Sequence, residues 1–197
     1  MYLRIYNIIL PDLLVEYICR SGGWLADIVL FGKGLSVECR IRAFMFHLKF
    51  GYNARDIGRR VIISKPQHLV LHKGASVRHG VVVMCGAAGV EIGERTHISH
   101  NSVLAASGGL TVGRDCGISS GVIIYTVDHD HTQGLPLAEC PVRASAVRIG
   151  NGVHIGANVT ILPGVDVGDD SIIGAGAVVT KSVNANSVVA GVPAREI

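Results

Sequence analysis

The sequence predicts an all-β solenoid whose chain winds into three-sided coils, and two observations predict it. Aliphatic residues recur at every sixth position over most of the chain, a step that belongs neither to an α-helix nor to a plain β-strand. This step is interrupted after residues 63, 83, 104 and 124, and three six-residue rungs separate each interruption from the next. The insertions therefore share one corner of a triangular coil of about 18 residues.

The rungs account for the core. Only 5% of the residues are aromatic, so aliphatic side chains must fill the interior, each resting on its counterpart in the next coil about 4.8 Å away. Gly, Asn and Asp near the corners tolerate the positive φ that a sharp turn needs. The predicted inward residues are Ile57, Ile63, Leu71, Val77, Val83, Ile92, Ile98, Leu104, Val112, Ile118, Ile124, Ile149, Ile155, Ile161, Val167, Ile173 and Val179.

The two ends lack the six-residue step. Residues 1–52 form a partly helical lead-in segment, and residues 53–197 form the solenoid domain. Within the lead-in, residues 38–50 mix aromatic, aliphatic and basic side chains, which indicates an amphipathic helix that packs on the solenoid or lies on a membrane surface. Residues 182–197 should form a cap that protects the open strand edges of the last coil.

Charge and cysteine content bear on compartment and partners. Residues 1–80 carry 12 Lys and Arg against 5 Asp and Glu, so this half either faces an anionic lipid or glycan or is simply solvated. The five cysteines are scattered and form no CxxC pair, which indicates a reducing cytoplasm. We recognise no signal peptide in the sequence, and no uninterrupted apolar run reaches the roughly 18–20 residues that a transmembrane helix needs. We expect a cytoplasmic protein, with peripheral contact at the inner face of the membrane left open, and no nucleic-acid partner.

Three stretches carry a family resemblance: IGNGVHIGANVTILPGV at 149–165, VGDDSIIGAGAVVTK at 167–181 and SVVAGVPAREI at 187–197. They resemble the hexapeptide-repeat acyltransferases, in the branch of galactoside and maltose acetyltransferases and polysaccharide O-acetyltransferases. The resemblance covers roughly residues 55–197. It implies a left-handed parallel β-helix, although parallel crossovers are normally right-handed. It also implies a homotrimer and an acetyl-CoA-dependent O-acetyltransferase that acts on a sugar hydroxyl in surface polysaccharide biosynthesis.

The longest insertion, the loop at 125–148, contains YTVDHDHTQG. The family places a catalytic histidine in the loop that leaves the prism here, and His129 matches it, with His131 as the competing candidate. A neutral imidazole suits this task, because a sugar hydroxyl must lose its proton as it attacks the thioester. Asp128 and Asp130 flank the histidine and either orient its ring or are ordinary loop residues.

The resemblance also assigns binding residues. Asn101 matches a family position that contacts the acceptor sugar, although a corner Asn can equally serve the backbone conformation. Small residues in the last coils allow close approach of the pantetheine arm, and basic residues suit the phosphates. His154 stands where close relatives often carry Trp. The residues assigned to coenzyme A are His154, Gly156, Ala157, Ala175, Thr180, Lys181 and Arg195.

Three alternatives remain open from the sequence. An amino-sugar N-acetyltransferase would need less help from a base. A γ-class carbonic anhydrase would bind zinc between subunits through His97, His100 and His129, but the long insertion and the acetyl-CoA-type ending argue against it, and we expect no metal. A solenoid without catalysis should show a regular ladder of one polar residue, whereas the outward positions here are mixed.

Overall fold

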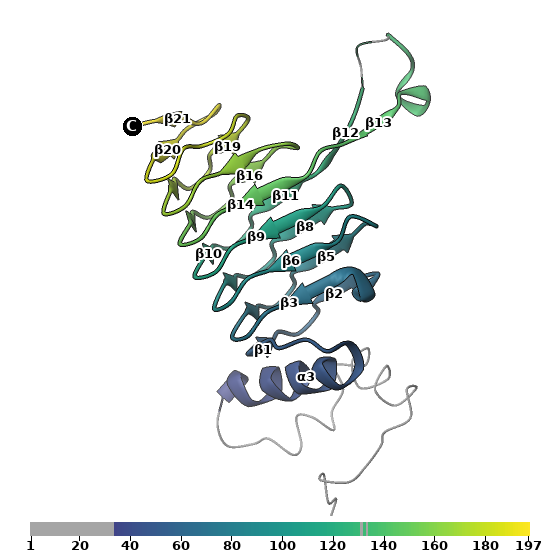
Figure 1. Cartoon of the computed structure of the whole chain (residues 1–197), viewed down its shortest axis with the longest axis vertical. Helices are drawn as coiled ribbons and strands as arrows, with labels where there is room; N and C mark the ends of the chain where they lie inside the picture. The colour runs from purple at the N-terminus through teal and green to yellow at the C-terminus, as the bar shows by residue number, and fades with distance from the viewer. Residues whose placement is uncertain (1–33, 131, 133) are drawn as a thin grey trace, which may run out of the picture.

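The computed structural model describes residues 34–130, 132 and 134–197 (Figure 1). The chain forms a parallel β-solenoid with helix α3 (Gly34–Phe50) across its N-terminal end. The predictions for the first 33 residues and for His131 lie outside the described residues. No described helix is long and apolar enough to span a membrane.

Three parallel sheets form the faces of the prism. The first face contains β1 (Asp56–Ile57), β4 (Ser76–Val77), β7 (His97–Ile98), β10 (Gly117–Ile118), β15 (His154–Ile155), β18 (Ile172–Ile173) and β20 (Val188–Ala190), with β21 (Arg195–Glu196) antiparallel at its end. The second face contains β2 (Ile62–Ser64), β5 (Val82–Cys85), β8 (Val103–Ala106), β11 (Ile123–Tyr125), β16 (Thr160–Ile161) and β19 (Val178–Val179). The third face contains β3 (Leu69–Leu71), β6 (Val90–Ile92), β9 (Leu110–Val112), β14 (Val147–Ile149) and β17 (Asp166–Val167).

The strand register confirms the six-residue step. Ile118 pairs with Ile98 in the preceding coil and with Ile155 in the following one, and these three side chains are fully buried. All other predicted inward residues are buried except Ile63, which is only partly covered in the first coil. Each buried aliphatic is worth about 1.5–3 kcal/mol relative to exposure, so the column of inward residues holds the coils together.

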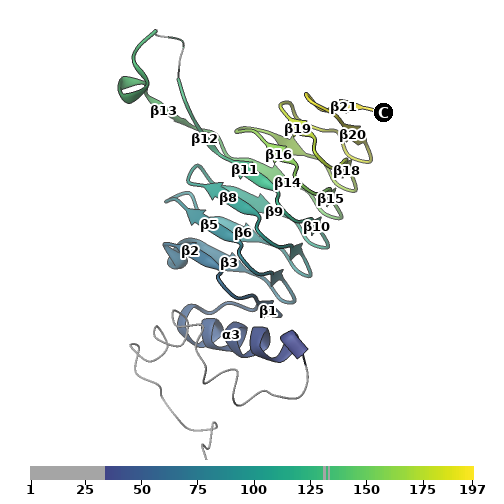
Figure 2. The same ribbon diagram turned by 180° about the vertical axis from the view of Figure 1, so that it is seen from behind.

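The insertions leave the prism at the corner between the second and third faces, as predicted. The short ones connect β2 to β3 through a 3₁₀ turn (Pro66–His68), β5 to β6 and β8 to β9. The longest lies between β11 and β14 and forms a projecting hairpin of β12 (Val127–His129) and β13 (Val142–Ala144), with a second 3₁₀ turn (Leu137–Glu139) (Figures 1 and 2). An insertion here leaves the backbone ladder of all three faces intact.

Both ends of the prism are covered. Helix α3 packs on the first coil, where Phe46 and Phe50 stack on the buried Tyr52, so the predicted helix at 38–50 lies on the solenoid. At the other end, residues 182–197 first complete a further coil, because β20 pairs in parallel with β18. Only then does the chain turn back as antiparallel β21, which shields the strand edge.

Two neighbouring residues in β18 test the inward column. Ile173 is fully buried and Ile172 is 44% exposed. We expect Ile173→Ala to lower the free energy of unfolding by about 2–5 kcal/mol, because it opens a cavity in the column. Ile172→Ala should cost less than about 1 kcal/mol. Urea denaturation of both variants measures the difference, and equal losses would contradict the predicted inward column.

Candidate active site

The hairpin between the second and third faces positions His129. This residue ends β12, pairs with Val142 across the hairpin and is exposed. Its Nδ1 lies 3.4 Å from the carbonyl oxygen of Cys140. A carbonyl can only accept a hydrogen bond, so Nδ1 carries the proton in this contact and Nε2 holds the basic lone pair. The fold thus offers one imidazole nitrogen as a proton acceptor on a projecting arm.

Asp130 anchors the arm. Its carboxylate is only 6% exposed and accepts hydrogen bonds from the backbone N–H and the hydroxyl of Thr132, at 3.1 and 2.6 Å. It also forms an ion pair with Arg143 on β13, with 2.5 Å between Oδ2 and Nη2. The hydrogen bonds from Thr132, followed by the charge of Arg143, lower the pKa of Asp130, so the carboxylate stays ionised.

Asp128 has a local role in the structure. Its Oδ1 accepts a hydrogen bond of 2.8 Å from the backbone N–H of His129. Asp128 therefore orients the backbone at the end of β12, whereas Asp130 ties β12 to β13. Both acidic residues that flank the histidine therefore support the arm that carries it.

Asn101 lies on a different edge from His129. It sits at the corner between the first and second faces with φ +57°, a left-handed conformation that Asn tolerates better than most residues. A Cβ built on Gly80 of the preceding coil would lie 2.3 Å from the Asn101 Oδ1. The Asn101 side chain thus covers the adjacent coil. This is the structural role of a corner Asn, which the sequence left open beside contact with the acceptor sugar.

The same corner carries three of the residues assigned to coenzyme A. The backbone N–H of Gly176 donates to Ala157, at 2.8 Å, so the turns that contain Ala157 and Ala175 stack directly on each other. A Cβ on Gly156 would lie 2.5 Å from the Ala175 nitrogen, so coil stacking alone requires this glycine. The resulting edge is lined by small residues and leaves backbone groups open to close approach.

His154 lies on the outer side of the first face and is exposed. Its Nδ1 is 3.2 Å from the position that a Cβ on Gly117 would occupy. The ring therefore lies over the glycine of the preceding coil, next to the small corner residues Gly156 and Ala157. This position is compatible with the contact to coenzyme A that the sequence assigned to it.

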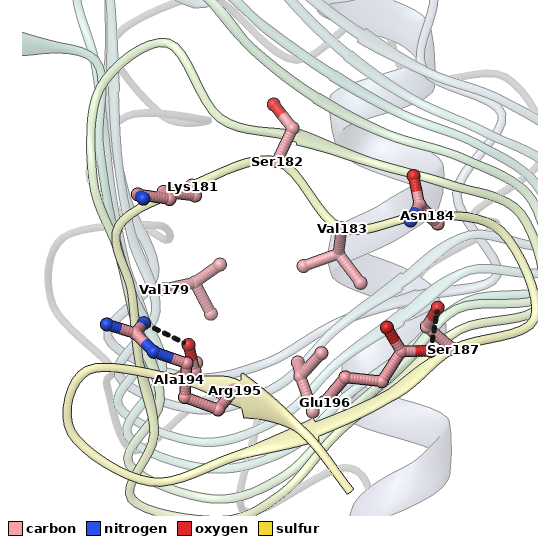
Figure 3. Close-up of a pocket in the computed structure, with 10 residues that line it drawn as sticks. Val179, Lys181, Ser182, Val183, Asn184, Ser187, Ala194, Arg195 and Glu196 are labelled. Carbon is pink, nitrogen blue, oxygen red and sulfur yellow. Dashed lines mark hydrogen bonds between the residues drawn. The ribbon is translucent and has the colours of Figure 1, made fainter.

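Lys181 and Arg195 line a cavity of about 240 Å³ at the C-terminal end of the prism (Figure 3). Val179, Val183, Val189 and Ala194 form the apolar part of its lining. Glu196 also lines the cavity, and its carboxylate accepts a hydrogen bond of 3.1 Å from the Ser187 hydroxyl. Two cations at one mouth suit phosphate groups through charge-assisted hydrogen bonds. Thr180 precedes Lys181 and is exposed. The residues present therefore fit a phosphate-bearing co-substrate at this end, coils away from the arm that carries His129.

The structure also groups basic residues that the sequence analysis did not assign to the acceptor. The rings of His79 and His100 lie side by side, with centroids 5.4 Å apart, and His97 Nδ1 lies 2.6 Å from the hydroxyl of Ser76. In the sequence, His79 and His100 both stand two positions after an inward aliphatic. This shared position was the signal that could have identified them. In the described part of the chain, no three His, Cys, Asp or Glu residues are arranged to hold a metal ion.

Comparison with known proteins supports the fold and the family. Residues 146–181 match the family model described as "Bacterial transferase hexapeptide (six repeats)". The chain is 30% identical over 183 residues to galactoside O-acetyltransferase from Escherichia coli (strain K12), which spans 90% of this chain and 85% of that protein.

Two solved structures share the fold. A maltose O-acetyltransferase from Clostridium difficile 630 has a TM-score of 0.62 and 25% identity, and the match covers 95% of this chain and 88% of that one. A variant of an N-acyltransferase from Bacillus cereus, in complex with dTDP-4-amino-4,6-dideoxyglucose and coenzyme A, has a TM-score of 0.69. It is 22% identical, with coverage of 78% of this chain and 86% of that one, and it supports the fold alone.

The six-residue step, the three-sided parallel coil and the similarity over nine-tenths of the chain agree with one another. This fold is the left-handed parallel β-helix expected from the sequence. The chain belongs to the hexapeptide-repeat acyltransferase family, in the branch that contains the galactoside and maltose O-acetyltransferases.

Proposed function

We propose that this protein transfers the acetyl group of acetyl-CoA to a sugar hydroxyl and that His129 is the general base. One observation carries the proposal: the long excursion between β11 and β14 fixes an exposed imidazole whose Nδ1 contacts a backbone carbonyl. This contact leaves Nε2 as the proton acceptor. An O-acetyltransferase needs such a base because a neutral hydroxyl attacks a thioester poorly.

The chemistry requires few groups. Nε2 of His129 takes the hydroxyl proton as the oxygen attacks the thioester carbonyl, and the imidazolium returns the proton to the departing thiolate. Asp130, held by Thr132 and Arg143, fixes the arm so that the ring keeps its orientation. Positioning of this kind supplies a large part of the acceleration in a two-substrate reaction.

Coenzyme A would lie along the small-residue edge of the last coils. Gly156, Ala157 and Ala175 would allow the pantetheine arm to approach the backbone, and His154 would lie beside it. Lys181 and Arg195 would bind phosphate at the cavity of the last coil, with Thr180 next to them. The separation between these two cations and His129 is what an elongated co-substrate requires, since its thioester and its phosphates lie at opposite ends.

We further propose a homotrimer that packs through the second face. Ile62, Val82, Val103 and Ile123 are neighbours in register along its outer side, and Ile62 is 60% exposed. Charged residues instead occupy the outer side of the third face, where Glu91, Arg148 and Asp166 stand in its strands. Val82, Val103 and Ile123 are partly exposed. A partly exposed apolar column along one face suits a protein–protein interface.

The trimer would also complete the site. Within one chain, His129 and Asn101 lie at opposite edges of the second face. Packing around a threefold axis through this face would bring the arm of one protomer toward the small-residue edge of the next. Asn101, Asp128 and His131 then remain candidates for contact with the acceptor. A role in surface polysaccharide biosynthesis also stays a prediction.

His129→Ala tests the general base. We expect kcat for O-acetylation to fall by about 10²–10⁴-fold, because the hydroxyl loses its proton acceptor. Turnover of labelled acetyl-CoA over a panel of free sugars, nucleotide sugars and polysaccharide repeat units measures the change. His72→Ala is the control, because His72 pairs with Glu91 far from the arm. Near-normal turnover of His129→Ala would contradict the mechanism. If the true acceptor is an amine and His129→Ala loses only a little turnover on it, the amino-sugar N-acetyltransferase is favoured.

Lys181→Ala and Arg195→Ala test the phosphate end. Each substitution should raise the KM for acetyl-CoA by about tenfold and leave kcat nearly unchanged, because the charge-assisted contacts lie far from the thioester. Steady-state kinetics with varied acetyl-CoA concentration provides the measurement. Lys73→Ala, in an earlier coil, is the matched lysine control. The assignment fails if the KM for acetyl-CoA does not respond to either change.

Val103→Lys tests the interface. A charge in the middle of the apolar column should dissociate the trimer to monomers, because an unpaired charge is costly to bury. Light scattering of the purified protein reports the mass. Thr111→Lys, at an exposed outward position on the third face, should leave the oligomer intact. A wild-type monomer, or a Val103→Lys variant with unchanged mass, would overturn the proposed packing.

A further inference from the structure

One edge of the solenoid holds a continuous row of side chains. It lies where the chain passes from the first face to the second. It contains the residue two positions after the inward aliphatic of β1, β4, β7, β10, β15 and β18. Backbone hydrogen bonds stack these turns, as between Gly80 N–H and Arg59 at 2.9 Å or Asn101 N–H and His79 at 3.0 Å. The members of this row, which we call the corner row, are Arg59, His79, His100, Ser120, Ala157 and Ala175.

The corner row changes character along its length. Its C-terminal half contains Ala157 and Ala175, the residues that would face the pantetheine arm. Its N-terminal half contains Arg59, His79 and His100. Coil stacking does not require imidazoles at this position, because Ser and Ala occupy it in the later coils. Folding therefore does not explain why basic residues occupy the N-terminal half of the corner row.

The tautomer of His79 is set by the fold. Its Nδ1 accepts a hydrogen bond of 2.7 Å from the backbone N–H of Arg59, so the proton of the neutral ring lies on Nε2. The ring of the exposed His100 lies next to it, with 5.4 Å between centroids and 31° between planes. Two imidazoles side by side in this way can donate hydrogen bonds to one ligand.

Positive charge surrounds this pair. The pKa of His79 is lowered, first by burial and then by electrostatic repulsion from neighbouring basic groups. These neighbours are His100, Arg42, Arg59 and Arg78. The buried carboxylate of Asp56 is shared between two guanidinium groups, Arg55 at 3.1 Å and Arg78 at 3.6 Å. One carboxylate neutralises one of these two cations, so positive charge remains beside the imidazoles.

We infer that His79, His100 and Arg78 bind an anionic group of the acceptor, and that the acceptor is therefore a charged sugar. A phosphate or a carboxylate supplies the chemistry, because both accept charge-assisted hydrogen bonds from imidazole and guanidinium groups. A sugar phosphate, a nucleotide sugar and a uronic acid all carry such a group. The role as an acceptor site rests on the proposed function; the anion site itself does not.

Histidine NMR of the full-length protein tests the anion site directly. Inorganic phosphate and glucuronate serve as the probes, and glucose is the neutral control. We expect saturable shifts of the His79 and His100 ring resonances with either anion and none with glucose. Bound anion should also raise the pKa of His79, because it favours the protonated ring, and added salt should weaken binding. A response to phosphate alone would identify a phosphorylated acceptor, and a response to glucuronate alone would identify a uronic acid.

Variants complete the test. His100 is exposed, so His100→Gln should fold normally and weaken the binding of the anion by about tenfold. Lys181→Gln should leave the imidazole response unchanged, since Lys181 lies at the other end of the prism. Ring resonances that do not respond to either anion, or that respond equally in His100→Gln, would overturn the site.

Kinetics separates this inference from the proposed function. With glucose 1-phosphate and methyl glucoside as matched acceptors, His100→Gln should raise the KM for the phosphate alone and spare kcat. If His129→Ala does not lower turnover, the assignment of the general base is wrong, but the anion site is unaffected. Equal KM values for the charged and the neutral acceptor in the wild-type enzyme would instead overturn the inference and leave the acetyl transfer intact.

Discussion

The close stacking of successive coils constrains every other feature of this protein. The coils are held together by a backbone ladder on three faces and by a column of inward aliphatic residues such as Ile98, Ile118 and Ile155. At the corners the contact is closer still, since a Cβ on Gly156 would lie 2.5 Å from the next coil. Side chains with chemical roles must therefore lie elsewhere, either at the next position of the corner or on an excursion that leaves the ladder.

The two kinds of position suit different tasks. A residue in the corner row has a fixed spacing to its neighbours, so the row suits the recognition of an extended ligand that runs along the prism. An excursion reaches beyond the prism, so it suits a group that must meet two substrates. His129 lies on the excursion, which lacks the backbone ladder of the prism. The Asp130–Arg143 ion pair holds the two strands of the arm together instead.

The repeat made most of the fold predictable, because each inward position is specified locally by its own hexapeptide. The repeat predicted that the insertions share one corner of the coil and that Ile118 and Ile124 are buried. The hairpin of β12 and β13 could not be predicted, since its pairing depends on Asp130 meeting a residue 13 positions away. The further coil before β21 was also missed, because the interval from Val179 to Val183 breaks the six-residue step, which resumes only from Val183 to Val189. Candidate site residues came from resemblance, which points to positions that match a family motif, such as His129, but not to side chains that the fold brings together, such as His79 and His100.

The order of elements along the second face links the arm to the corner row. Strand β11, from which the arm departs, lies between β8 and β16. His100 stands just before β8 and Ala157 just before β16, so the arm leaves from the coil between the basic and the small halves of the row. In a trimer packed through this face, the arm of one protomer would face the middle of its neighbour's row. The imidazole would then have the thioester on one side and the charged acceptor on the other, as direct acetyl transfer between them requires.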